Sequence, residues 1–294
     1  MPKTNLPLSP QEATRTILKN LPTRRMRDVL EKRFGLRGSK KLTLEAIGRE
    51  YKITRERVRQ IEADALKHLG KEDNLNEIKP LFASIREHLK NHGEVMAEHH
   101  LMATLGENKD KAHLGLLLDV CKDFHNLPET EHHYSRWTID KTSAEKAEKS
   151  LKNVIVDLEK NGKAVSKEEL NGLVEKNTKE ITAVTPEPSI VETYLATSKM
   201  IGQNPYGEYG LVSWPTISPR GIKDKAYVAL SKNSQPMHFL EIAQAINKAG
   251  WSKKKAHPQT VHNELIKDSR FVLVGRGLYA LNGDISRGWC GMFW

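Results

Sequence analysis

The stretch TLEAIGREYKITRERVRQIEADALKHL, residues 43–69, places four arginines within eleven positions, from Arg49 to Arg59. Thr43 and Thr54 are both suitable N-caps. Apolar residues follow each threonine at helical spacing, and those after Thr54 form the stripe Val58, Ile61, Ala65, Leu66 and Leu69. The stretch therefore predicts two helices joined by a turn of three to four residues, the arrangement of a helix-turn-helix.

Near the start of the second predicted helix, the polar residues are of types that suit contact with DNA. Arginine can donate two hydrogen bonds to guanine, glutamine can pair with adenine, and glutamate can accept a hydrogen bond from cytosine. On a solvated helix, Lys and Glu would be scattered as i,i+4 pairs. Here the arginines gather at the positive end of the helix dipole, where they gain no stabilisation unless they meet an anion. Spacing alone leaves a DNA-reading helix and a solvated helix as alternatives, and it favours the first.

Basic charge is unevenly distributed along the 294 residues, whose formal net charge is +10. Residues 22–69 hold 14 Lys and Arg against 7 Asp and Glu, and residues 220–283 hold 11 against 4. The intervening residues 70–219 hold 18 against 24. Two basic end segments separated by an acidic middle predict two surfaces that meet polyanions.

Residues 22–69 resemble region 4 of the bacterial sigma-70 family of transcription initiation factors. The resemblance lies in the helix ending KRFG, residues 32–35, and in the run TRERVRQIEA, residues 54–63. In that family this run docks on the −35 promoter element. The resemblance implies base-edge contacts by Arg55, Glu56 and Gln60, and phosphate contacts by Thr54, Arg57, Arg59 and Lys67. Asp64 stands where the family often has a lysine, which puts one backbone contact in doubt.

The same resemblance implies further partners and limits. Region 4 also grips the polymerase flap through its apolar helices, so RNA polymerase core joins double-stranded, promoter-like DNA among the implied partners. The aromatic-rich segment with which complete sigma factors melt the −10 region is absent from the sequence. We therefore expect a protein that does not initiate transcription alone.

Three similar segments begin at Lys90, Lys160 and Lys232, 70 and 72 residues apart. Each follows an apolar helix and precedes an aromatic strand, in the helix, strand, helix, helix, hairpin order of a winged helix. The predicted fold is mainly α, a helix-turn-helix followed by three tandem winged-helix-like domains with small β-hairpins; three unrelated helical units are the alternative. The predicted boundaries are 1–70, 71–141, 142–218 and 219–283, with an apolar tail at 284–294.

The last copy, residues 220–283, resembles the HARE-HTH family of winged helices, which is similar to the delta subunit of bacterial RNA polymerase. This implies association with DNA or polymerase, without contact residues that can be carried over. Lys253, Lys254 and Lys255 precede a predicted recognition helix at Pro258 with the apolar stripe Val261, Leu265 and Ile266. These lysines and Arg276, at the predicted wing tip, are candidate DNA contacts; a solvated loop is the alternative for each. The first two copies are acidic, and the segment 112–124 is mostly apolar, so we expect them to bind protein or each other.

Other function classes find little support in the sequence. No apolar run approaches the roughly 20 residues that cross a bilayer, and two cysteines fit a reducing compartment. We expect a cytoplasmic, nucleoid-associated protein with no metal, cofactor or small-molecule substrate, and not an enzyme. The expected function is that of a DNA-binding transcription regulator. The alternatives are a polymerase-binding accessory factor that reads no sequence, or a DNA-targeting subunit of a restriction/modification system.

Overall fold

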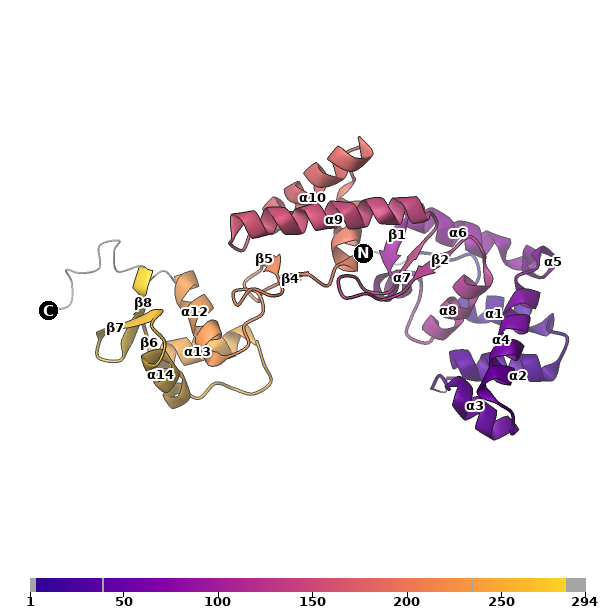
Figure 1. The fold of residues 1–294 in the computed structure, drawn as a ribbon, viewed down its shortest axis with the longest axis horizontal. Coiled ribbons are helices and arrows are strands. Elements are labelled where there is room, and N and C mark those ends of the chain that lie inside the picture. Colours follow the sequence, from indigo (N-terminus) through magenta and orange to yellow (C-terminus); the bar gives the residue numbers. More distant parts are fainter. Residues whose placement is uncertain (1–3, 39, 234, 284–294) are drawn as a thin grey trace. The chain divides into compact units, whose positions relative to one another are not determined.

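The chain is mainly helical, with small antiparallel sheets (Figure 1). The computed structural model describes residues 4–38, 40–233 and 235–283. Contacts divide the chain into two compact units, residues 1–151 with 175–198, and residues 152–174 with 199–294. The predicted apolar tail, residues 284–294, lies outside the described residues.

The first unit begins with four helices, which we call the head. Threonine side chains cap three of them: Thr23 accepts a hydrogen bond from the Met26 N–H, Thr43 from that of Ala46 and Thr54 from that of Arg57. The two helices predicted from residues 43–69 are therefore confirmed. The bounds of the head helices and of the two short helices after them are α1 Pro10–Lys19, α2 Arg24–Phe34, α3 Leu44–Tyr51, α4 Arg55–Leu69, α5 Glu72–Leu75 and η1 Asn76–Ile78.

The next elements of the first unit form a winged-helix arrangement. Their three strands are antiparallel and lie in the order β1-β3-β2, with Val95 and His125 both opposite Thr138. The elements are α6 Lys79–Lys90, β1 Val95–Ala97, α7 Glu98–Leu105, α8 Lys111–Val120, β2 His125–Leu127 and β3 Arg136–Thr138.

The last elements of the second unit repeat this order. Their sheet has the equivalent strand order β6-β8-β7, again antiparallel. The elements are α12 Ile222–Asn233, β6 Met237–His238, α13 Phe239–Ala249, α14 Pro258–Ile266, β7 Phe271–Gly275 and β8 Leu278–Leu281. Sequence repetition and topology thus agree for the first and third predicted copies.

The middle copy follows the same element order with less sheet. Its first strand is reduced to a single bridge between Val165 and Tyr209, beside the two-stranded hairpin β4-β5. The elements are α9 Lys141–Asn161, α10 Lys167–Thr182, α11 Pro188–Thr197, β4 Ile201–Gln203 and β5 Tyr209–Leu211. The division into two units passes through α9 and α10. The count of three winged-helix domains and their boundaries therefore stay predictions.

One apolar core joins the head to the elements that follow it. In α8, Leu114 and Leu117 are fully buried in the same cluster as Ile17 of α1, Leu30 of α2 and Leu69 of α4. The apolar helix that the sequence assigned to protein binding thus has its partner inside its own unit. Among the described residues, no helix is both long and apolar enough to cross a membrane.

Candidate nucleic-acid interface

A tight turn sets the position of α4 against α3. Lys52 ends α3 in the left-handed region, with φ of 55°, and the Ile53 N–H donates a 2.9 Å hydrogen bond to the Gly48 carbonyl. A Cβ on Gly48 would lie 2.7 Å from the Ile53 carbonyl oxygen. Glycine is therefore required at position 48 for the turn to close on α3.

The inner face of α4 is buried along its length. Val58 and Ile61 lie in a small core with Val29 and Ile47, whereas Ala65 and Leu69 enter the larger core of the unit. Polar contacts add to this anchoring, because Arg33 of α2 lies 3.1 Å from Glu62 of α4 and donates a 2.8 Å hydrogen bond to the Leu42 carbonyl. The outer face of α4 is thus held on a rigid support.

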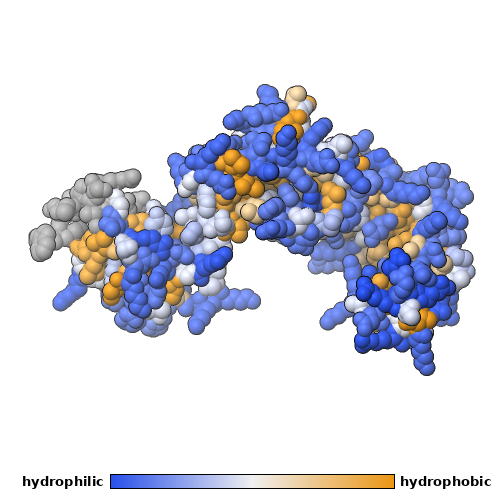
Figure 2. All heavy atoms as spheres, in the orientation of Figure 1, coloured by the Kyte–Doolittle hydropathy of each residue, from blue (hydrophilic) through white to orange (hydrophobic). Residues whose placement is uncertain are grey.

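All seven head residues predicted to contact DNA are exposed. The face of α3 and α4 that is visible in Figure 2 is mostly hydrophilic. Six of the seven residues occupy the N-cap and first two turns of α4; Lys67 follows Arg55 by twelve residues, or about 18 Å along the helix axis. The structure therefore brings together Thr54, Arg55, Glu56, Arg57, Arg59 and Gln60, and places Lys67 apart from them. The Thr54 hydroxyl accepts the capping bond from Arg57 N–H at 3.2 Å, which leaves its O–H free to donate.

The exposed residues of α4 pair with one another in the free protein. Arg59 holds both carboxylate oxygens of Glu56, at 2.9 and 2.7 Å, and Arg57 donates a 3.0 Å hydrogen bond to Gln60. The bond from Arg59 lowers the pKa of Glu56, so the carboxylate is ionised near neutral pH. In the part of the chain that the structure describes, the Arg55 side chain makes no ion pair or hydrogen bond. Arg55 can therefore meet a ligand without breaking a contact.

A contact that was not predicted from the sequence supports the turn. The Tyr51 ring at the end of α3 lies 5.2 Å from the Arg25 guanidinium and 4.7 Å from the Lys32 ammonium, both from α2. Lys32 also forms an ion pair with Glu50, and the hydrogen bond in that pair raises the pKa of Lys32. An aromatic residue directly before the turn was the signal available in the sequence.

The second basic surface lies in the last winged helix. Lys253, Lys254 and Lys255 are exposed in the loop between α13 and α14, which we call the lysine loop. Asn247 of α13 fixes this loop, since its side chain accepts a 2.7 Å bond from the Ala256 N–H and donates a 3.0 Å bond to the Ala256 carbonyl.

The turn between β7 and β8 presents Arg276, which is exposed. Gly277 has φ of 75°, and a Cβ there would lie 2.5 Å from the His238 ring nitrogen Nε2. The turn therefore requires glycine and leaves the Arg276 side chain in solvent.

Histidines near this surface have structural partners. His257 caps α14 by accepting from the Gln259 N–H, and the His262 ring lies 3.0 Å from the Tyr279 hydroxyl. No cluster of three metal-binding side chains is found within residues 4–38, 40–233 and 235–283.

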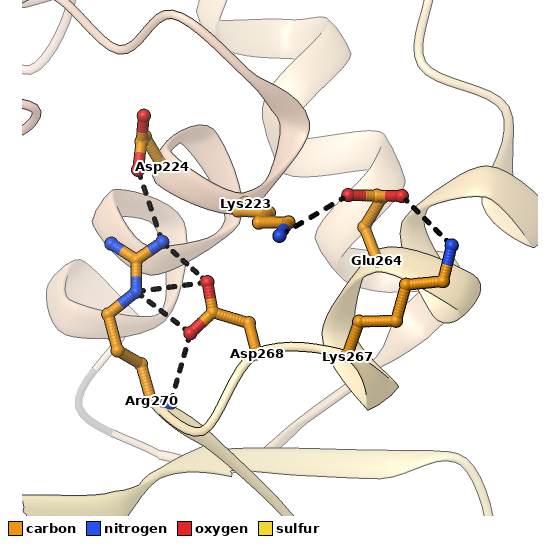
Figure 3. A network of polar contacts seen from close by, with 6 residues as sticks. All are labelled: Lys223, Asp224, Glu264, Lys267, Asp268 and Arg270. Carbon is orange, nitrogen blue, oxygen red and sulfur yellow. Dashed lines mark hydrogen bonds and ion pairs between the residues drawn. The ribbon is translucent and has the colours of Figure 1, made fainter.

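Three of the four acidic residues of segment 220–283 gather in one network at the far end of α14 (Figure 3). Arg270 lies 2.7 Å from Asp268 and 3.1 Å from Asp224, and Glu264 pairs with Lys223 and Lys267. The hydrogen bonds from Arg270 lower the pKa of Asp268 to about 2. The network lies at the end of α14 opposite to the lysine loop, and three cations balance its three acids. The lysines of the loop therefore have no acidic residue of this network beside them.

One residue of the predicted apolar stripe of α14 is not in the core. Val261 and Leu265 are buried, but Ile266 is 65% exposed. Ile266 follows Leu265 by one residue, about 100° around the helix, and so leaves the buried face.

Comparisons with known proteins agree with the two resemblances. Residues 17–71 match the family model for Sigma-70, region 4, and residues 220–283 match the model for HARE-HTH, a helix-turn-helix domain named in part for restriction endonucleases. The chain is 53% identical over 47 residues to RNA polymerase sigma factor SigA of Lactococcus lactis subsp. cremoris, which covers 16% of this chain and 13% of that protein. It is 48% identical over 58 residues to RNA polymerase sigma factor RpoD of Neisseria gonorrhoeae, covering 20% and 9% respectively. The chain thus covers only about a tenth of the length of these relatives. Separately from that match, it carries a segment that matches Sigma-70, region 4 at residues 17–71 and a segment that matches HARE-HTH at residues 220–283.

Proposed function

We propose that the protein is a DNA-binding transcription regulator that reads a −35-like promoter element with the amino-terminal half of α4. The observation that carries this proposal is the exposed group from Thr54 to Gln60, built on a buried helix face and matched to a sigma-70 region 4. Arg55, Glu56 and Gln60 would contact base edges, while Thr54, Arg57, Arg59 and Lys67 would hold phosphates. The protein would then act on DNA in the nucleoid.

Opening the two side-chain pairs on α4 is part of this mechanism. Arg59 and Arg57 would leave Glu56 and Gln60 for phosphates, which frees the carboxylate and the amide for the bases. The cost is small, because solvent screens ion pairs between exposed side chains and such pairs contribute little to stability. The released arginines would gain stronger, charge-assisted bonds to phosphate.

Association with RNA polymerase is the second candidate function, and it is favoured by the two families matched. One route to polymerase, through the apolar helices of region 4, meets an obstacle in this chain. The apolar side chains of α1 and α2, such as Ile17 and Leu30, are fully buried in the core shared with α8. Contact by that route would require α8 to leave its place, so we place DNA reading first.

Selection of bound duplexes from a random pool tests the proposal without presuming polymerase. We expect an enriched −35-like element that is lost when Arg55 and Gln60 are replaced by alanine. Equal binding of the full chain to random and −35-like duplexes would contradict the promoter part of the proposal.

A further inference from the structure

The chain has three sets of elements in the order that the sequence predicts for a winged helix, and these sets differ in the contacts of the last helix before the hairpin. In the first set this helix is α8, whose apolar residues are buried against the head. In the middle set it is α11, whose Tyr194 hydroxyl donates a 3.2 Å hydrogen bond to the Gly93 carbonyl. A Cβ on Gly93 would lie 2.7 Å from Tyr194 and Ile190, so α11 packs closely there. Both helices are thus committed to contacts inside the first unit.

The equivalent helix of the third set, α14, keeps a polar face in solvent. Gln259, Asn263 and Ile266 stand at positions i, i+4 and i+7 and are all exposed. Val261 and Leu265 hold the other side in the core. Gln259 donates a 3.3 Å hydrogen bond to the Asn263 side-chain carbonyl, which aligns the two amides along one line. The face offers paired donors and acceptors without charge.

Exposed cations stand before and after α14 in the chain. The lysine loop leads directly into the first turn of α14, and Arg276 extends from the hairpin that follows. Three of the four acids of the segment are paired with Arg270, Lys223 and Lys267 at the other end of α14, and the fourth, Glu241, lies in the first turn of α13. An uncharged amide face on a helix that begins directly after a lysine-rich loop suits base reading, with the lysines available for phosphate contacts.

We infer that α14 is a second sequence-reading helix, in which Gln259 and Asn263 recognise adenine in A·T pairs in the major groove. Glutamine and asparagine are the side chains whose amides match the N6 donor and N7 acceptor of adenine. The exposed Ile266 supplies an apolar contact for a thymine methyl group. This inference rests on the proposed DNA binding, but it concerns a surface separate from α4.

The test uses the full chain with Arg55→Ala and Gln60→Ala, so that α4 no longer reads bases. Duplex selection should enrich a short motif with adjacent A·T pairs. In that motif, 7-deaza-adenine, which lacks the N7 acceptor, should weaken binding about tenfold or more. Adding Gln259→Ala or Asn263→Ala to this chain should weaken its binding to the normal motif. In these variants, replacing adenine with 7-deaza-adenine should then cause no further loss of affinity. Gln244→Ala, an exposed amide on α13, is the matched control and should leave the response intact.

The outcomes separate this inference from the proposed function. Enrichment of an A·T motif whose analogue response depends on Gln259 or Asn263 supports the inference. Failure to enrich any motif, or a motif indifferent to both amides, overturns it. Base reading by α4 is tested separately, by binding of the unmodified chain to the −35-like element. Either claim can therefore fail without contradicting the other.

Discussion

Arg59 grips Glu56 through two hydrogen bonds, of 2.9 and 2.7 Å, on the exposed side of α4. The chain has a close counterpart on α3, where Arg49 lies 2.6 Å from Glu45. Both pairs consist of exposed side chains one helical turn apart. They differ in that only Glu56 is predicted to contact a base, which makes them a matched set for mutation.

Replacing Glu56 with alanine should change selectivity more than affinity. The variant loses a negative charge and releases Arg59, so binding to random duplex should tighten, while preference for the −35-like element over random DNA should fall. Glu45→Ala changes the net charge equally and releases Arg49, but it should keep the preference. Fluorescence anisotropy at fixed salt measures the affinity for each duplex, and the ratio of the two affinities gives the preference. An unchanged ratio for Glu56→Ala would remove Glu56 from base reading.

Gly48→Ala should destabilise the head. The new methyl group would lie 2.7 Å from the Ile53 carbonyl oxygen, a backbone atom that cannot swing aside. We expect a loss of about 1–3 kcal/mol in the free energy of unfolding, the usual cost of overpacking.

Gly115→Ala is the control, for which we expect the opposite change in the free energy of unfolding. Gly115 lies inside α8, and an added Cβ would meet nothing within 4 Å. Alanine should therefore stabilise this helix by about 0.5–1 kcal/mol. Urea unfolding of the full chain measures both changes, and a stable Gly48→Ala variant would contradict the packing described for the turn.

The Asp268–Arg270 pair predicts a loss of stability in acid. The pKa of Asp268 is about 2 in the folded state against 3.8 ordinarily, so the folded state binds the proton less readily. The stabilisation is complete above pH about 4 and is lost as the pH falls toward 2.

Asp268→Asn should therefore lower the urea midpoint of segment 220–283 at pH 7 and reduce its dependence on pH between 4 and 2. Deuterium pulse labelling of α12, α14 and β7 along a urea titration reports that midpoint. The same acid dependence in the variant and the parent chain would assign the effect to other groups.

Lys254→Ala should weaken binding to all duplexes alike. Loss of one phosphate contact should reduce the slope of log Kobs against log salt by about 1. Lys267→Ala is the control, because Lys267 lies at the opposite end of α14 and pairs with Glu264 at 3.6 Å. A slope unchanged in Lys254→Ala would show that the lysine loop is merely solvated.

The sequence could predict features that depend on local chemistry. Thr43 and Thr54 start helices where their hydroxyls accept backbone N–H bonds, and the spacing of Val58 and Ile61 identifies the buried face of α4. The repeated order of elements was likewise readable, and two of its three copies have the same strand order.

Features that depend on contacts between residues far apart in the sequence could not be predicted from it. The apolar pattern of α8 indicates that the helix packs against other apolar residues. Its spacing could not predict that these residues lie in α1, α2 and α4. The position of Tyr51 between Arg25 and Lys32 likewise exists only after α2 has packed on α3. Nor does the sequence show that Glu56 and Gln60 are engaged by arginines in the free protein.

The exposed start of α4 as a DNA-reading surface is most directly tested by Arg55→Ala, with Arg49→Ala as the charge-matched control on α3. Titration of the full chain with −35-like and random duplexes at one salt concentration gives the difference between the two binding free energies. We predict that Arg55→Ala lowers this discrimination by about 1–3 kcal/mol and relaxes preference at one base position, whereas Arg49→Ala preserves it. Equal loss on both duplexes, or no loss at all, would contradict the reading of bases by α4.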